Sequence, residues 1–334
     1  MRPSAPMAAR GRHVFHAIAL IVGGVAFAIL IHHVGWEGLV AAVIGTGWWF
    51  VVMAAIDLAS VLCDAGATYS FVRPHTPVSY WRIFAAHASG VAINRLTPAN
   101  SLGEAVKITM IAEHAPTPIA VSGIVMFNLA TFMVAIAAIV LGVPVTLLLL
   151  DLPGQTQMYV WIATAVLVGV FVTLLVVARR GALGTLIGAA QKLRLVSATR
   201  ADLWRAKVGN IDGHVKQFGR VGARRGIGFV IASRVLSWIG TVVVMIAAKV
   251  PLTPALVAAN LSLGILITFL STAVPLGLGI ADGSNYALYG VLGSTGPLGL
   301  VYTMIGRART CVLAGMGLGV MLIANFVDRR KRAS

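Results

Sequence analysis

Long apolar runs separated by short polar stretches dominate this chain of 334 residues. A helix rises about 1.5 Å per residue, so about 20 apolar residues cross the ~30 Å hydrocarbon core of a bilayer. Six runs are long enough and are predicted to be full membrane spans: 14–33, 41–62, 118–149, 157–178, 226–249 and 297–325. Pro144 is expected to kink or end the third of them. The pattern predicts an all-α polytopic membrane protein.

Two further apolar regions, 78–114 and 254–292, are interrupted by the breaks NRLTPANS and STAVPLGLG. Three of the four flanking halves are too short for a full span. Non-helical backbone at membrane depth is tolerated only where protein buries it or where it lines a wet cavity. We therefore interpret both regions as re-entrant helix–break–helix hairpins. For 254–292, an alternative interpretation as two crossings stays open.

Lysine and arginine residues concentrate in the N-terminus, in the loop 179–225 and in the tail 326–334. Because basic loops stay in the cytoplasm, both termini and this loop are predicted to be cytoplasmic. Residues 1–334 then form a single transmembrane domain with two halves, 1–178 and 226–325, each containing one hairpin. The hairpins enter from opposite sides, as in an inverted repeat whose broken elements meet near the midplane.

Composition narrows the class of protein. Only 11% of the residues are charged, against roughly 25% in soluble domains. The net charge is +16. The basic residues that produce it lie between apolar runs and not on a solvated face, so nucleic-acid binding is not expected. Cys63 and Cys311 show no CxxC spacing and no histidine cluster, so neither a disulfide framework nor a metal site is expected. No cofactor is expected.

Charged side chains at membrane depth cost at least about 2.5–3.5 kcal/mol and usually mark a pathway or an ion pair. The candidate substrate-binding residues are Asn94, Arg95, Glu104, Lys107, Asp282 and Arg307. Additional candidates around the breaks and in the second predicted span are Asp57, Pro98, Gly103, Pro275, Gly277 and Gly279. We expect Asp64 and Arg309 nearer a membrane interface.

Both hairpins allow more than one interpretation. Glu104 and Lys107 lie three residues apart and share a helix face. A lipid phosphate is expected at the N-terminus of that helix, supported by Arg95 and Lys107. In the alternative, Arg95 pairs with Glu104 and only holds the hairpin shut. Asp282 either caps a helix that begins near Ala281 or faces the first hairpin as a counter-charge or proton carrier.

Three further side chains need explanation. Arg307 lies inside the last predicted span and requires an anion, for which Asp282, Glu104 or a lipid headgroup qualifies. Asp57 has no neighbour in sequence to pair with and requires a partner from another helix. Of the eight histidines, only His87 lies within the first hairpin and merits a test.

The segment NRLTPANSLGEAVK, residues 94–107, resembles the N-x-x-x-P-x-x-x-x-G-E-x-x-R/K pattern of the lysyl-phosphatidylglycerol synthase transmembrane (flippase-like) family. The segment VPLGLGIADGSN resembles the same family's P-G-G-L-G-x-x-E pattern, and Arg307 fits an arginine of its final span. Asp282 stands where glutamate is usual, and Leu276 replaces a glycine. The resemblance implies a stand-alone lipid-translocating module without the soluble synthase domain, since the chain ends at Ser334.

These observations favour a lipid flippase or transporter and not an enzyme. Arg95, Lys107 and Arg307 would hold an anionic headgroup, and Glu104 and Asp282 would supply counter-charge. The resemblance implies a bacterial inner membrane, with phospholipids or isoprenoid lipids as partners, and a homo-oligomer is compatible with it. One alternative is a non-transporting subunit of a lipid-modification complex. The other is an intramembrane lipid-headgroup enzyme, for which no GxSxG, HExxH or Walker pattern is present.

Overall fold

The computed structural model describes residues 36–97, 102–149, 222–271, 279–292 and 294–333, with isolated positions between 21 and 32 and between 158 and 173. Every regular element within these residues is a helix, as predicted. The helices are α2 (Trp36–Thr46), α3 (Trp49–Val72), α4 (Tyr80–Leu96), α5 (Leu102–Ala112), α6 (Thr117–Leu148), α10 (Ala223–Ala247), α11 (Pro254–Ser271), α12 (Ile280–Val291) and α13 (Gly296–Ala333).

Four of these helices, α3, α6, α10 and α13, are long and apolar enough to cross a membrane. They correspond to four of the six predicted spans. The other two predictions, 14–33 and 157–178, fall mostly outside the described residues, as does nearly all of the basic loop 179–225. Helix α13 continues to Ala333, so most of the tail predicted at 326–334 prolongs the last helix.

The bounds of the second predicted span, 41–62, were wrong. The structure divides this region between α2 and α3, and α3 continues to Val72. The division lies at Gly47, whose φ of 55° lies in the left-handed region that glycine adopts at little cost. Residues 45–49, GTGWW, are less apolar than the residues on either side, and the prediction joined the two apolar stretches across them.

Helix α6 lies close to its predicted bounds and passes through Pro144, so this proline does not end the helix there. Helix α4 continues through Leu96, which places Asn94 and Arg95 on the helix and not in the break. It stops at Thr97, whose backbone is extended, with φ −113° and ψ 144°. Thr97 precedes Pro98 in the sequence. A proline ring disfavours helical backbone angles in the residue before it, which explains why the helix ends here.

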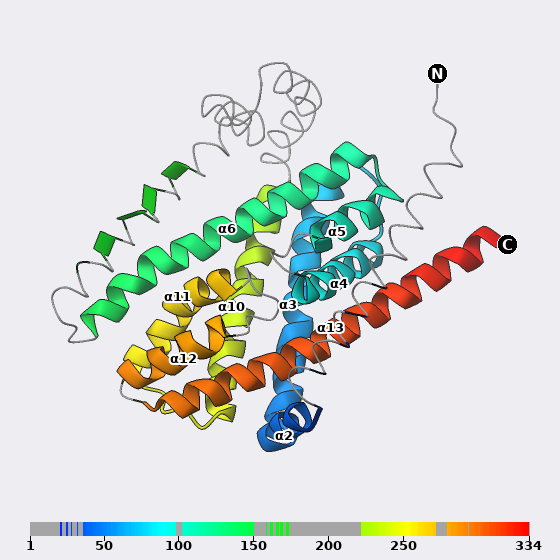
Figure 1. The fold of residues 1–334 in the computed structure, drawn as a ribbon. Helices are drawn as coiled ribbons and strands as arrows, with labels where there is room; N and C mark the ends of the chain where they lie inside the picture. Colours follow the sequence, from blue (N-terminus) through cyan, green and yellow to red (C-terminus); the bar gives the residue numbers. More distant parts are fainter. Residues whose placement is uncertain are drawn as a thin grey trace, which may run out of the picture.

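The helices pack in two matching sets (Figure 1). In the first hairpin α4 contacts α13 and α5 contacts α6, whereas in the second hairpin α11 contacts α6 and α12 contacts α13. Helices α3 and α10 pack against each other between the two hairpins. Exchanging α3, α4, α5 and α6 for α10, α11, α12 and α13 reproduces this pattern. The packing therefore has an approximate two-fold symmetry.

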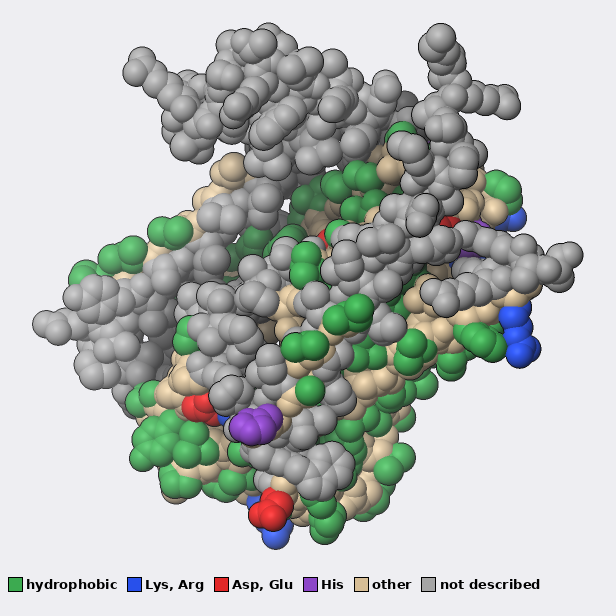
Figure 2. Space-filling model, turned by 45° about the vertical axis from the view of Figure 1, so that its right-hand side comes forward, with side chains coloured by type: hydrophobic (Ala, Val, Ile, Leu, Met, Phe, Trp, Pro, Cys, Tyr) green, Lys and Arg blue, Asp and Glu red, His purple; other side chains and the backbone are tan. Residues whose placement is uncertain are grey.

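Close helix contacts depend on small residues in the α3–α10 pair. Gly66 faces the ring of Phe229, and Gly226 faces the ring of Phe71, which is fully buried. On the side shown in Figure 2, the coloured surface is largely hydrophobic and carries few charged side chains. An apolar outer surface matches the hydrocarbon environment that the composition predicts.

Candidate functional site

Charged side chains on the hairpins and on the long helices form four partly buried ion pairs. Each of four carboxylates on the described helices binds a lysine or arginine. The pairs are Glu104–Lys107, Asp282–Arg307, Asp57–Arg309 and Asp64–Arg234. Three of the four join different helices. Ion pairing lowers the cost of placing these charges in an apolar environment.

Glu104 is the centre of the first hairpin's polar cluster. Its Oε1 accepts hydrogen bonds from Asn94 Nδ2 at 2.9 Å and from Lys107 Nζ at 2.7 Å, and its Oε2 accepts one from Asn128 Nδ2 at 2.8 Å. Lys107 is only 3% exposed, and its Nζ lies 5.5 Å from the centre of the Phe127 ring. These contacts tie α4, α5 and α6 together at one carboxylate.

The two arms of this hairpin approach closely at two glycines. Asn94 Oδ1 accepts a hydrogen bond from the backbone N–H of Gly103 at 2.8 Å, which satisfies a donor in the first turn of α5. A Cβ at Gly90 would lie 2.8 Å from the carbonyl oxygen of Gly103. A Cβ at Gly103 would overlap the carbonyl oxygen of Gly90 and the Asn94 side chain. Side chains larger than hydrogen would therefore separate α4 from α5.

Asp282 caps a helix, as the first of its two interpretations predicts, and its ion-pair partner is on α13 and not on the first hairpin. Its Oδ2 accepts a hydrogen bond from the backbone N–H of Gly279 at 2.9 Å, so it caps the start of α12. The same oxygen binds Arg307 on α13 at 2.5 Å. Gly279 has a φ of 79°, a conformation that disfavours other residues. Of the three anions considered for Arg307, the structure therefore pairs it with Asp282.

Asp57 pairs with an arginine of another helix, as the sequence required. Arg309 binds both of its carboxylate oxygens, one of them from Nε at 2.5 Å. Asp57 is 5% exposed. Arg309 lies within the apolar stretch of α13 and binds Asp57 of α3, and its expected position nearer a membrane interface stays a prediction. A small surface indentation beside the pair is lined by Phe50, Ala54, Val312 and Leu313.

Arg95 differs from the other candidate cations. Its side chain is exposed, and its guanidinium donates to the hydroxyl of Thr310 on α13 at 3.2 Å. Glu104 is bound by other groups, so the structure does not contain the Arg95–Glu104 pair considered as an alternative. Within the described residues no carboxylate forms an ion pair with Arg95, although Asp57 and Arg309 lie within electrostatic reach.

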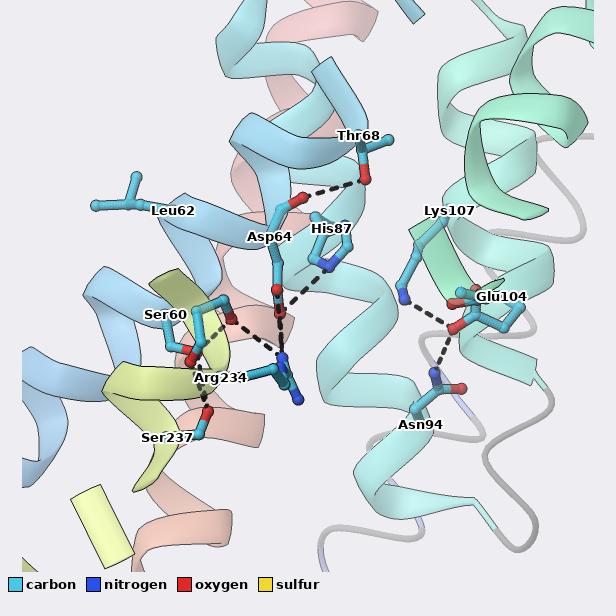
Figure 3. Close-up of polar contacts among 12 residues, drawn as sticks. Ser60, Leu62, Asp64, Thr68, His87, Asn94, Glu104, Lys107, Arg234 and Ser237 are labelled. Carbon is cyan, nitrogen blue, oxygen red and sulfur yellow. Dashed lines mark hydrogen bonds and ion pairs between the residues drawn. The ribbon is translucent and has the colours of Figure 1, made fainter. Parts of the chain in front are cut away.

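A second polar cluster lies where α3, α10 and α4 meet (Figure 3). Both oxygens of Asp64 accept from Arg234, at 3.1 and 3.3 Å. His87 Nε2 lies 3.9 Å from the same carboxylate. Ser233 accepts a hydrogen bond from Arg234 at 3.0 Å and shares one with Ser60 at 2.9 Å. The Asp64 side chain is buried between helices, and its expected position nearer a membrane interface stays a prediction.

Sequence reasoning missed Asn128 and Arg234. Each is a polar side chain inside a predicted span, and a polar residue in an apolar run could have marked it as a candidate. This signal does not identify their partners Glu104 and Asp64, because those lie on other helices. Three candidates, Pro98, Pro275 and Gly277, lie outside the residues that the structure describes. Within the described part of the chain, no group of three histidine, cysteine, aspartate or glutamate side chains is placed to hold a metal ion.

The fold and the paired charges define an integral membrane protein built from several candidate spans and two helical hairpins. The model of the lysylphosphatidylglycerol synthase TM region matches residues 15–317, so the chain belongs to this family. The family is involved in phospholipid modification and flipping. A search of curated proteins found no match to the chain.

Proposed function

We propose that this protein moves an anionic lipid between the two leaflets of a membrane, with Arg95 as the residue that binds the headgroup. The observation that carries the proposal is the charge balance of the site. Glu104, Asp282, Asp57 and Asp64 each have a cationic partner, whereas Arg95 is exposed and, among the described residues, has only a hydroxyl partner. The surplus charge of the site is therefore positive, which favours a phosphate-bearing headgroup.

The structure narrows the roles expected for the other cations. Lys107 and Arg307 are already bound to carboxylates, so they hold the hairpins in place and Arg95 remains for the substrate. Glu104→Gln is then a poor functional test, because it leaves the buried Lys107 without its counter-charge. Arg95→Gln is a better test, since an exposed side chain can be changed with little effect on folding.

The matched packing of the two helix sets supports an inverted repeat of two re-entrant hairpins. Helix α12 has 12 residues, or about 18 Å of helix, which is too short for a full crossing. Each hairpin contacts both α6 and α13, so a rocking of one set against the other would move both hairpins together. Alternating exposure of Arg95 to the two leaflets would then carry a headgroup across while its chains stay in lipid.

Localisation and partners are part of the same proposal. A bacterial inner membrane with both termini in the cytoplasm agrees with the distribution of lysine and arginine. The partners are membrane lipids, either phospholipids or isoprenoid phosphates. The lipid leaves the protein chemically unchanged, so we do not propose an enzyme. The second candidate, a non-transporting subunit, requires that the purified protein moves no lipid.

Arg95→Gln is expected to slow the movement of anionic lipid by about 10- to 100-fold. Hydrogen bonds to charged groups contribute about 1.5–3 kcal/mol, and each 1.36 kcal/mol is a factor of ten in rate. The measurement is leaflet exchange of labelled phosphatidylglycerol, phosphatidylcholine and an isoprenoid phosphate in liposomes that contain the purified protein. Arg82→Gln is the matched control, because Arg82 is an exposed arginine in the first turn of the same helix.

The outcomes separate the candidates. Loss in Arg95→Gln with normal exchange in Arg82→Gln supports headgroup binding at Arg95, and the lipid that moves gives the substrate class. Equal exchange in both variants would remove Arg95 from the site. Folded wild-type protein that moves none of the three lipids would favour the subunit interpretation.

A further inference from the structure

His87 is a buried titratable group that lipid binding at Arg95 leaves unexplained. It lies on α4 and is 2% exposed, and its Nδ1 has no hydrogen-bond partner within the part of the chain that the structure describes. Its Nε2 lies 3.9 Å from Asp64, beyond hydrogen-bonding distance. Buried polar atoms without partners are uncommon and require an explanation. A proton-binding role provides one, since the imidazolium would gain a carboxylate partner.

Charged groups from several elements surround His87 (Figure 3). Asp64 from α3 faces it directly and favours the imidazolium, whereas the cations Arg234 from α10 and Lys107 from α5 disfavour it. From α6 the neighbour is the ring of Phe127, edge-on at 4.7 Å between ring centres. Helix α13 presents Gly317 to α4, and its two central arginines are bound to α12 and α3.

Phe127 and Arg234 connect His87 with the rest of the site. The ring of Phe127 contacts His87 and also lies beneath the ammonium group of Lys107. Arg234 acts on both His87 and Arg95. An anionic headgroup at Arg95 would make the local potential less positive and so favour proton binding at His87. Because coupling is reciprocal, a proton on His87 would strengthen headgroup binding to the same extent.

The acids of the site are poorly placed for this role. Each is bound by a lysine or an arginine, which favours the ionised form. Protonated His87 would instead compete with Arg234 for Asp64. Arg234 would keep its hydrogen bond to Ser233 when it releases the carboxylate. Protonation therefore alters the contact between α3 and α10, the helices that lie between the two hairpins.

We propose that His87 is the proton-binding site of the transporter, and that one proton moves together with one anionic headgroup in the same direction. This inference rests on the proposed lipid movement. Co-transport of a proton with a singly charged phosphodiester lipid carries no net charge through a low-dielectric region, where an unpaired charge is costly. No bond is made or broken in the lipid, and the proton binds the imidazole and leaves it on the other side.

The first test measures leaflet distribution of labelled phosphatidylglycerol in liposomes with a pH difference of about one unit. Wild-type protein is expected to enrich the label in the leaflet on the alkaline side by up to about tenfold. One pH unit is a tenfold difference in proton concentration, and one proton moves with each lipid. His87→Gln is expected to give equal leaflets with lipid still moving. His75→Gln, in the turn between α3 and α4, is expected to behave as wild type.

Equal leaflets with active wild-type protein would overturn the proton site and leave lipid movement standing. A normal response of His87→Gln to the pH difference would also overturn it. If the wild-type protein moves no lipid, the proposed function fails, and a second measurement still decides the proton site.

That second measurement follows the imidazole signals of wild-type protein by NMR, with isotope-labelled histidine and lipid nanodiscs. The proton affinity of His87 is expected to rise when phosphatidylglycerol replaces phosphatidylcholine, because an anion nearby favours the imidazolium. The signal is assigned by its loss in His87→Gln. An affinity that is the same in both lipids would overturn the coupling, whatever the transport assay shows.

Discussion

Arg309→Met is expected to destabilise the folded protein by about 3–5 kcal/mol, the usual cost of removing one partner of a buried ion pair. Arg309 binds both carboxylate oxygens of Asp57, which is 5% exposed. Methionine would leave this carboxylate charged and unpaired between α3 and α13. The measurement is the free energy of unfolding in detergent micelles, followed by circular dichroism during denaturant titration.

The double variant Asp57→Leu with Arg309→Met tests the cause. Replacing both charged groups by apolar ones of similar size removes the unpaired charge, so most of the lost stability is expected to return. Arg225→Met serves as the control, since Arg225 is exposed near the start of α10. A double variant as unstable as Arg309→Met would show that packing of the arginine, and not its charge, stabilises this contact.

Gly103→Val is expected to separate the two arms of the first hairpin and to abolish lipid movement. The added Cβ would overlap the carbonyl oxygen of Gly90 and the side chain of Asn94. Backbone must move to relieve that overlap, and overpacking of this kind typically costs 1–3 kcal/mol. Separation would also break the hydrogen bonds from Asn94 to Glu104 and from Gly103 to Asn94. Unfolding free energy and leaflet exchange are the measurements.

Gly264→Val is the matched control, because Gly264 lies in α11 and a Cβ there would meet nothing within 4 Å. Both substitutions place a β-branched residue in a helix, so their shared effect on helix propensity cancels in the comparison. If the two variants lost equal stability and both moved lipid normally, close approach of α4 and α5 would not matter for function.

The predicted helical architecture was largely correct because its signals are local. The length of an apolar run determines whether it can cross the bilayer, and α6, α10 and α13 begin within a few residues of their predicted starts. The main error, at 41–62, arose at Gly47, where the left-handed backbone of a glycine separates two apolar stretches that the prediction joined. The less apolar residues 45–49 marked this turn in the sequence, and the prediction ran through them.

The composition of the site was partly predictable. Charged residues in apolar segments are costly and therefore informative, which is why Asp57, Glu104, Lys107, Asp282 and Arg307 were candidates. Their roles were less predictable. Arg95, Lys107 and Arg307 were expected to hold the headgroup. Of these three, only Arg95 has no carboxylate partner among the described residues.

The amino-acid sequence by itself determined the membrane class, the all-helical architecture and the charged residues that required partners. Hydropathy, helix length and motif spacing are properties of neighbouring residues. Only the tertiary structure decided which carboxylate pairs with which lysine or arginine. Asp57 and Arg309 are separated by 252 positions, and Arg234 reaches Asp64 across 170. Hydrogen bonds and ion pairs act over a few ångströms, so their partners depend on how the helices pack, and the local pattern carries no record of that packing.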